Sequence, residues 1–210
     1  MGSNRRWRRS DEVVVTRVLV VFAHPGTESL NREVLRRVTT ALETGHHDFR
    51  VRDLYAEGFD SRLSRAEKQA HFDAPDTKPH LASHFADLVW CEALVLVHPT
   101  WWGQQPAILK GWFDRVWAHG VAWDFPEGAT RLRPRLRNIR RLVTITTHGS
   151  PWYVNAVQGM PGKRLANRGL RVLCHPLCRT TWIARWGLDR DNPRATTRFF
   201  RRINRCLRRL

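Results

Sequence analysis

The chain has 210 residues, which fits one domain, and 42% of them are hydrophobic, enough to bury a core and to argue against intrinsic disorder. Its formal net charge of +17 comes from arginine, because the only lysines are Lys68, Lys78, Lys110 and Lys163. Such a charge favours anionic partners (nucleotide phosphates, nucleic acid or an acidic membrane surface), but it does not choose among them.

The amino-terminal segment is basic and lacks the apolar stretch of a secretory signal. We therefore expect a disordered arm over residues 1–12, followed by a single domain over residues 13–210. The apolar run Val13–Ala23 contains Thr16 and Arg17 and is shorter than the about 20 residues that a membrane span needs. We expect a soluble, cytoplasmic protein.

Apolar runs rich in β-branched residues alternate along the chain with segments of helical periodicity. In chain order, the sequence predicts strand Val18–Phe22, helix Ser29–Glu43, strand Phe49–Asp53, helices Ser64–Phe72 and Lys78–Trp90, strand Ala93–Val97, helix Pro106–Trp117, strand Arg141–Thr146, helix Lys163–Leu173, strand Arg179–Trp186 and helix Thr196–Leu210. Residues 121–138 lack periodicity and read as a loop or hairpin. Five strands separated by helices predict an α/β fold with a doubly wound parallel sheet.

The last helix is expected to dock on the core by its apolar stripe while its arginines stay in water. The stripe comprises Phe199, Phe200, Ile203, Leu207 and Leu210, and the arginines comprise Arg201, Arg202, Arg205, Arg208 and Arg209. Through these basic ends we expect at most a weak, nonspecific association with anionic membrane or nucleic acid that fades near physiological salt.

The four cysteines are too sparse for a disulfide scaffold, and reduced thiols are expected. The segment Cys174–Cys178, with His175 inside it, could be read as part of a metal site. Zinc needs about four ligands and no second cluster supplies the rest, so no metal is expected.

Three loops that leave buried strands carry the polar residues of interest, and ligands of open α/β sheets bind at such loops. The first contains His24, Thr27, Ser29, Leu30 and Asn31 at a helix start, where backbone N–H groups and the helix dipole favour a phosphate. The same residue types are ordinary helix caps, so this loop alone is weak evidence for a site.

The second loop runs through Pro99, Thr100, Trp101, Trp102 and Gly103. Adjacent tryptophans diverge, so at least one should face the crevice and offer a flat wall to a planar heterocycle. The third loop has Thr146, Thr147, His148 and Gly149, mostly small residues that let the backbone approach a ligand closely.

The helix Pro106–Val116, with the sequence PAILKGWFDRV, is almost a family signature. Together with the three loops, it makes the chain resemble, from about Val18 to Trp186, the flavodoxin-like NAD(P)H dehydrogenase (quinone) family, which includes DT-diaphorase-type quinone reductases and potassium-efflux ancillary oxidoreductases. The resemblance implies a flavodoxin-like five-stranded, three-layer α/β/α fold. It also implies a homodimer with FAD or FMN at the interface, FAD being slightly favoured, and NAD(P)H as donor. The tryptophans of the signature helix are then candidates for that interface.

The resemblance also assigns the loops. His24, Ser29, Leu30 and Asn31 fall on the flavin-phosphate loop. Pro99 to Trp102 fall on the loop beside the isoalloxazine edge, and Thr146, Thr147 and Gly149 on the loop that meets the pyrimidine side of the ring.

Three positions depart from the family pattern. His148 stands where the family usually has the first glycine of Thr-Thr-Gly-Gly, a strained choice if that position needs positive φ. Tyr153 is one residue away from the family's tyrosine, and Pro161 aligns with its histidine. We take Tyr153, His148 and Trp102 as candidate catalytic residues; the alternative is that His148 and Tyr153 are plain loop residues.

The expected reaction is hydride transfer from NAD(P)H to a quinone or similar acceptor, with both substrates using one site in turn by a ping-pong mechanism. Backbone N–H groups of Thr147 to Gly149 would stabilise the negative charge of the reduced ring. The main alternative is a flavin-binding ancillary or regulatory subunit of a membrane transporter. An electron carrier would be smaller and acidic, and no nucleic-acid-binding signature is found among the basic residues.

Overall fold

The structure is a computed structural model that describes residues 15–73, 75, 78–190 and 192–210. The arm expected over residues 1–12 lies outside these residues. Within them, a parallel sheet of five strands has the order β2-β1-β3-β6-β7. The strands are β1 (Arg17–Phe22), β2 (Asp48–Asp53), β3 (Ala93–Pro99), β6 (Arg141–Thr147) and β7 (Arg179–Arg185). The predicted α/β fold and its five strands are confirmed.

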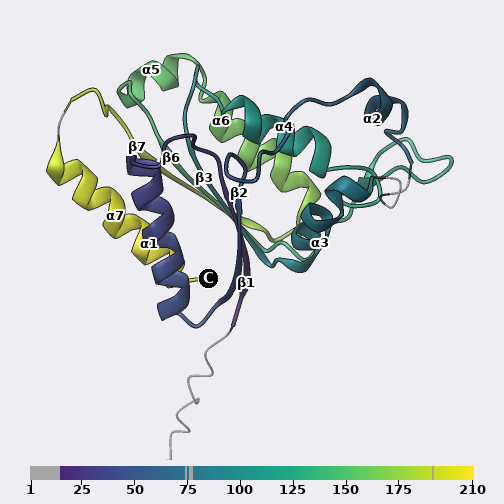
Figure 1. Cartoon of the computed structure of the whole chain (residues 1–210), viewed down its shortest axis with the longest axis horizontal. Helices are drawn as coiled ribbons and strands as arrows, with labels where there is room; N and C mark the ends of the chain where they lie inside the picture. Colours follow the sequence, from purple (N-terminus) through teal and green to yellow (C-terminus); the bar gives the residue numbers. More distant parts are fainter. Residues whose placement is uncertain (1–14, 74, 76–77, 191) are drawn as a thin grey trace, which may run out of the picture.

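Helices cover both faces of the sheet (Figure 1). On one face lie α1 (Leu30–Thr44) and α7 (Pro193–Leu207), and on the other lie α3 (Ala82–Trp90), α4 (Ala107–Val116) and α6 (Pro161–Arg164). The helices α1, α3, α4 and α7 follow the apolar periodicity of the sequence, which gives each one a stripe to bury against the continuous apolar strands.

The last helix docks as predicted. Phe199, Ile203 and Leu207 are at most 2% exposed and pack with α1 and the strands in one core cluster, while Phe200 and Leu210 are partly buried against it. The arginines of α7 at positions 201, 202, 205, 208 and 209 are all exposed. Burial of the apolar stripe therefore fixes the position of the helix, and its charges remain in water.

The tryptophans of the signature helix are not at a surface, so the prediction that they form an interface is wrong. Trp112 is fully buried and its indole N–H donates to His84 Nδ1 at 3.3 Å. Trp117, which follows α4, is 6% exposed and lies in the same core cluster. Both side chains fill the layer between the sheet and α3, where apolar packing uses their large area.

The segments between the sheet strands are less regular than the periodicity predicts. The helix expected over Ser64–Phe72 is only α2 (Arg65–Gln69), closed by a capping box between Ser64 and Glu67. The helix expected over Lys78–Trp90 opens with a 3₁₀ turn at Pro79–Leu81 before α3 begins. Pro79 is the first residue of this turn, a position where proline is tolerated because its missing N–H would have no intrahelical acceptor.

Two more segments change form. The excursion over residues 121–138 contains a two-residue antiparallel pair, β4 (Trp123–Asp124) with β5 (Arg133–Pro134), so the hairpin alternative is confirmed. The segment after α6 continues as a π-helix over Leu165–Leu170 and a 3₁₀ turn over Arg171–Leu173. A short helix, α5 (Trp152–Val157), was not predicted.

The strand order places a switch point in the middle of the sheet. From β1 the chain moves to β2 on one side, whereas β3 pairs with β1 on the other side. Loops that leave β1 and β3 therefore diverge at the carboxyl edge, and this position is where open α/β sheets bind ligands. The three loops singled out in the sequence all leave strands at this edge.

Candidate functional site

Direct hydrogen bonds connect the three loops at the carboxyl edge of the sheet. Asn31 Nδ2, at the start of α1, donates to Thr147 Oγ1 at 2.9 Å. The backbone N–H of Thr100 donates to the carbonyl of Thr147 at 2.7 Å. Asn31 and Thr147 are buried, and residues that are distant in sequence thus form one contiguous structure.

The first loop ends in a capped helix. Ser29 is the N-cap of α1, and its Oγ accepts the backbone N–H of Arg32 at 3.1 Å. Its side chain therefore serves the helix itself, as N-cap serines do. The N–H groups of Leu30 and Asn31, at the first positions of α1, have no intrahelical partner by construction. They leave the positive end of the helix available to an anion.

Three further side chains of this loop differ in whether their polar atoms have hydrogen-bond partners. His24 Nδ1 accepts the backbone N–H of Gly26 at 2.9 Å, which leaves its other ring nitrogen directed elsewhere. Thr27 is exposed and its hydroxyl has no partner within the described residues. Asn31 Oδ1 is buried without a partner in the same part of the chain. A buried acceptor of this kind calls for a donor from outside the loop.

The second loop is a tight turn that displays a tryptophan. Trp101 and Gln104 exchange backbone hydrogen bonds at 3.0 Å in both directions, and the residues between them, Trp102 and Gly103, have φ of 51° and 78°. Two central residues with positive φ define a type I′ turn. A bulky residue seldom adopts positive φ, and such strain concentrates at functional sites. Trp102 is also 98% exposed.

The turn rests on the segment that begins α6. A methyl group on Gly103 would lie 2.7 Å from Gln158 Oε1 and 3.5 Å from Pro161 Cγ, and the φ of 78° favours glycine at this position. Gln105 Nε2 donates to the carbonyl of Gly162 at 3.1 Å. Pro161, which stands at the family's histidine position, therefore supports the turn by packing against it.

The third loop centres on a buried histidine. His148 is 2% exposed, lies 3.8 Å from the Trp186 ring between centroids, and has its Nε2 3.2 Å from Thr100 Oγ1. The Thr100 hydroxyl in turn lies 2.8 Å from that of Thr146. His148 is not among the residues with positive φ, so its substitution for glycine causes no strain of that kind.

Burial keeps both histidines of this edge neutral. Desolvation, and to a lesser degree the charge of His98, lowers the pKa of His148 to about 3. Desolvation lowers the pKa of His98 to about 4, although its Nδ1–H donates to the Pro99 carbonyl at 2.8 Å. Near neutral pH both rings are therefore uncharged. Each has one nitrogen that donates a hydrogen bond and one that accepts.

The backbone donors of this loop are fewer than expected. The N–H of His148 donates to the carbonyl of Arg185 at 2.8 Å, so the expectation that it faces a ligand is wrong. The parallel pairing of β6 with β7 continues one residue past the strand and takes up this group. Gly149 and Ser150 have N–H groups without a partner among the described residues, and these two groups are free to meet an anionic ring.

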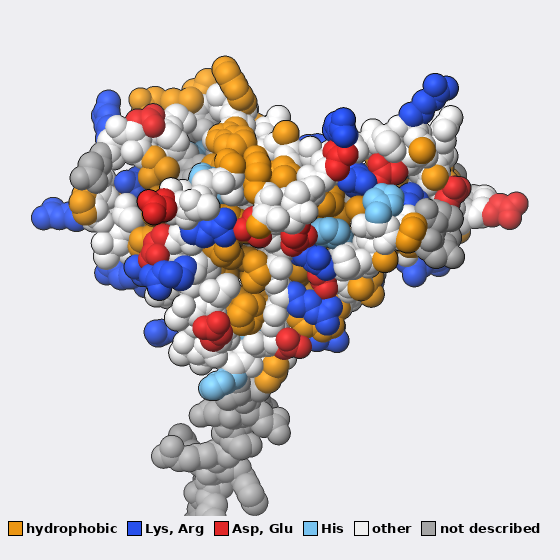
Figure 2. Space-filling model, viewed as in Figure 1, with side chains coloured by type: hydrophobic (Ala, Val, Ile, Leu, Met, Phe, Trp, Pro, Cys, Tyr) orange, Lys and Arg blue, Asp and Glu red, His pale blue; other side chains and the backbone are white. Residues whose placement is uncertain are grey.

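Exposed aromatic residues flank the edge. On α5, Trp152 is 60%, Tyr153 58% and Val157 89% exposed. Together with Trp101, at 43%, and Trp102 they form an exposed hydrophobic surface, which we call the edge patch. Figure 2 shows hydrophobic side chains along the upper edge of the molecule, where Figure 1 draws α5.

The sequence alone missed two contributors to the site. Trp186, which stacks on His148, was taken only as the end of a strand. Asp189 lies against the third loop, because a methyl group on Gly149 would be 2.9 Å from its Oδ1. A fourth strand-exit loop, after β7, therefore joins the edge. This loop lies next to the third loop because β7 pairs with β6 in the sheet. The sequence predicts both strands but not that they are neighbours.

Neither a membrane span nor a metal cluster is found among the described residues. None of the described helices is long and apolar enough to cross a membrane. Among the described residues, no group of three or more His, Cys, Asp or Glu side chains is placed to hold a metal ion.

Comparison with known proteins agrees with this architecture. Residues 16–171 match a family described by its flavodoxin-like fold. The chain belongs to this flavodoxin-like family. The match includes all three loops of the edge as well as the signature helix, and the predicted flavodoxin-like fold is confirmed.

Relatives in this family include named oxidoreductases. A ribosyldihydronicotinamide dehydrogenase-like protein of Penicillium crustosum is 33% identical over 127 residues, 53% of this chain and 47% of that protein. An uncharacterized NAD(P)H oxidoreductase of Haemophilus influenzae is 30% identical, with 60% and 63% covered, and NAD(P)H dehydrogenase [quinone] 1 of Cavia porcellus is 28% identical, with 64% and 54% covered. The matches thus span about half to three fifths of these relatives.

Solved structures align over nearly the whole chain. The NAD(P)H:quinone oxidoreductase from Methanothermobacter marburgensis has a TM-score of 0.77 at 27% identity and covers 92% of this chain and 98% of its own. An FMN-dependent NADH-azoreductase from Bacillus anthracis, in complex with FMN, has a TM-score of 0.71 at 15% identity and shares the fold. The resemblance to NAD(P)H dehydrogenase (quinone) proteins is confirmed.

Proposed function

We propose that this protein is a flavin-dependent oxidoreductase that transfers a hydride from NAD(P)H to a quinone or a similar acceptor. The observation that carries the proposal is the convergence of Asn31, Thr100 and Thr147 at the switch point of the sheet, beside an exposed Trp102 in a strained turn. The names of the relatives and of the aligned structures support the same class of reaction.

The residues of the edge fit a bound flavin. The N-terminus of α1, with the free N–H groups of Leu30 and Asn31, suits a phosphate. The partnerless Asn31 Oδ1 suits a donor from the ligand, and the free N–H groups of Gly149 and Ser150 suit a ring that gains negative charge. These features serve FMN and FAD equally, so the slight preference for FAD stays a prediction. When bound, a flavin supplies the site that accepts and returns the hydride.

The protein's own groups orient and shield the reactants. Trp102 offers one aromatic face to whichever planar partner enters, since it is almost fully exposed. Because the exposed aromatic side chains near the three loops belong to one edge patch, we infer that donor and acceptor use the same place in turn, which gives ping-pong kinetics. Intersecting double-reciprocal plots with a demonstrable ternary complex would contradict this inference.

His148 and Tyr153 are proposed to assist catalysis in different ways. Neutral His148 keeps the Thr100 hydroxyl in place through its Nε2, and its buried Nδ1 has no partner among the described residues. Tyr153 is 58% exposed on α5, where its hydroxyl can reach a substrate and exchange a proton. Replacing Tyr153 by Phe should lower kcat more than it raises KM if this role is right.

A second copy of the chain is the proposed cover of the edge patch. Three aromatic residues there are more than half exposed: Trp102, Trp152 and Tyr153. Exposed apolar surface of this kind marks interaction sites. A homodimer would exclude water from the reaction, and sedimentation at several concentrations tests it directly.

Flavin binding tests the proposed function first. The purified protein should be yellow or should bind one FAD or FMN per chain, identified by chromatography after release. A well-folded protein that takes up neither flavin at high concentration would refute the proposal. Flavin binding without NAD(P)H–quinone turnover would instead favour the alternative, a flavin-binding subunit that regulates a membrane transporter.

A further inference from the structure

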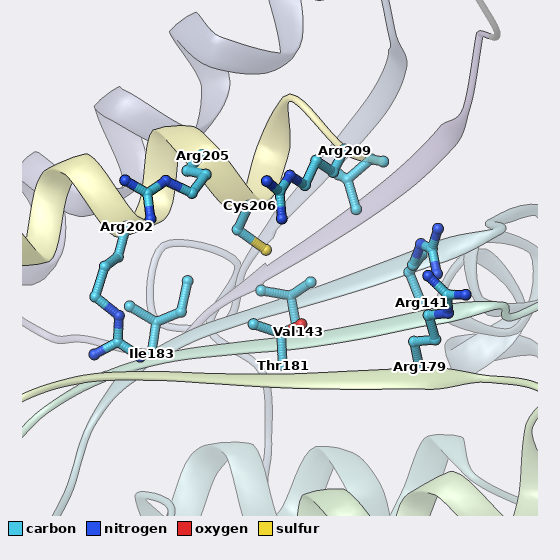
Figure 3. A pocket seen from close by; sticks show the side chains of 10 residues that line it. Arg141, Val143, Arg179, Thr181, Ile183, Arg202, Arg205, Cys206 and Arg209 are labelled. Carbon is cyan, nitrogen blue, oxygen red and sulfur yellow. The ribbon is translucent and has the colours of Figure 1, made fainter.

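A pocket of about 300 Å³ lies between α7 and the strands β6 and β7 and includes the first residue of each strand, whereas the edge site lies at their carboxyl ends (Figure 3). Val143, Thr181 and Ile183 point from the strands toward the helix, and Cys206 points from the helix toward them. The volume of the pocket is at the lower end of the about 300–1,000 Å³ typical of small-molecule sites.

Five arginines surround the apolar strand residues of this pocket. Arg141 and Arg179 are the first residues of β6 and β7, while Arg202, Arg205 and Arg209 come from α7 and the residues just after it. Among the residues that the structure describes, no acidic side chain lines the pocket. Residues from three segments, far apart in the sequence, thus bring the same charge to one place.

These arginines lack the counterions that other arginines of the protein have. Arg115 pairs with Glu67 at 2.7 Å, Arg52 with Asp87 at 2.5 Å and Arg133 with Asp124 at 2.7 Å. Within the described residues, none of the five pocket arginines forms an ion pair with a carboxylate. In the same part of the chain, the one hydrogen bond made by these five side chains is donated by Arg202 to the Trp182 carbonyl, at 3.4 Å.

The strand register places two of these arginines next to each other. Arg141 and Arg179 are direct partners in the pairing of β6 with β7. Register partners of parallel strands project from the same face of the sheet, so the two guanidinium groups are neighbours. Like charges placed directly opposite each other destabilise a sheet unless an anion lies between or above them.

We propose that this pocket binds a small anion with two or more linked phosphate groups. Guanidinium groups bind phosphate oxygens in bidentate fashion, and five of them arranged around one pocket can hold adjacent phosphates at once. The apolar floor of Val143 and Ile183 accepts an uncharged part of the same ligand. The chemistry is that of a free polyphosphorylated metabolite or of a phosphate-bearing lipid headgroup, and the two sources are separable by experiment.

Calorimetric titration with pyrophosphate, at about 150 mM salt where surface charges are largely screened, is the main test. We expect saturable binding of one pyrophosphate per chain. Binding should weaken at least about tenfold in R141Q/R179Q and in R202Q/R205Q, because each variant removes two charge-assisted contacts. The matched control is R194Q/R198Q, which removes the same charge from exposed positions of the same helix outside the pocket and should leave binding within about twofold of the parent.

A second measurement locates the ligand. Cys206 lines the pocket and is partly exposed, whereas the other three cysteines are buried. Pyrophosphate should therefore slow alkylation of Cys206 by iodoacetamide in the parent protein and in R194Q/R198Q. It should not protect Cys206 in R141Q/R179Q.

Flotation with vesicles that contain diacylglycerol pyrophosphate, a lipid whose headgroup carries two linked phosphates, distinguishes the source of the phosphate. Vesicle binding that is lost in both pocket variants and retained in R194Q/R198Q supports a lipid headgroup as the ligand. Pyrophosphate binding without vesicle binding supports a free metabolite. The proposal is overturned if neither probe binds at this salt, or if all three double variants weaken binding equally, since charge alone would then explain it.

Discussion

The two ends of the parallel sheet differ in the charge and pairing of their polar side chains. At the carboxyl edge, His98, Thr146, Thr147 and His148 are almost fully buried and their side chains are kept neutral or hydrogen-bonded to one another. At the amino-terminal end, Arg141 and Arg179 stand side by side without a carboxylate partner in the described residues. On the proposals made above, the first end would recognise its ligand by shape and hydrogen bonds, and the second by charge. One sheet thus supports two kinds of binding.

The largest effect that separates the two ends is acid sensitivity. The pKa values of His98 and His148 are lowered by burial to about 4 and about 3, so an unfolded chain takes up their protons first as the pH falls. Their contribution to stability is complete above the ordinary pKa of 6.5 and is lost as the pH falls toward the folded values. Between about pH 7 and about pH 5 the loss is about 2 kcal/mol for each histidine.

Urea unfolding at several pH values measures this loss. His148→Gln should remove about half of the pH dependence that the edge contributes, because Gln does not titrate. R141Q/R179Q should leave it unchanged, because arginine stays charged throughout. His84, whose pKa burial lowers to about 4, adds a similar loss elsewhere in the protein and remains in all these variants. An unchanged pH dependence in His148→Gln would show that this ring is hydrated.

The next effect concerns flavin affinity. Asn31→Ala removes a buried amide that joins two loops and is proposed to meet the ligand, so flavin should bind about tenfold or more weakly. Ser29→Ala should instead lower stability by about 1 kcal/mol, since its Oγ caps α1. Asn204→Ala, an exposed change near the arginine end, is the matched control and should affect neither property. Equal flavin affinity in Asn31→Ala and the parent would make Asn31 purely structural.

The sequence predicts more of the carboxyl edge than of the arginine end. The strand-exit loops were predictable, because apolar runs locate the strands and parallel strands bring their carboxyl ends to one edge. The stacking of Trp186 on His148 and the engagement of the His148 N–H by Arg185 were not. Both depend on which strand lies next to β6, a tertiary fact without a local signal.

The arginine end was predictable only as a charge. The apolar stripe of α7 placed Phe199 and Ile203 in the core correctly. Nothing in the sequence pairs Arg141 with Arg179, since the two residues are 38 positions apart and only the strand register aligns them. The same reason explains why the tryptophans of the signature helix were misplaced: periodicity gives a buried face but does not say what covers it.

A smaller effect tests the strained turn at the carboxyl edge. Trp102→Asn should raise the free energy of unfolding by about 1 kcal/mol, because Asn-Gly suits a type I′ turn better than Trp-Gly. The same variant should lower turnover with both NAD(P)H and quinone, since it removes the proposed common wall. Trp101→Asn changes a neighbouring tryptophan without positive φ and should not gain stability. A Trp102→Asn protein with parental activity would separate the strain from the function.

The smallest effect tests the other end of the comparison. If Arg141 and Arg179 repel each other in the free protein, R141Q/R179Q should be more stable than the parent by about 0.2–1 kcal/mol at low ionic strength. Added sodium chloride should shrink the gain by screening, whereas pyrophosphate should reverse its sign, because the anion stabilises only the parent that binds it. Urea unfolding with each salt at matched ionic strength distinguishes the two effects. A gain that both salts reduce equally would mean that the arginines sense general screening, and the carboxyl edge would then be the sheet's one selective end.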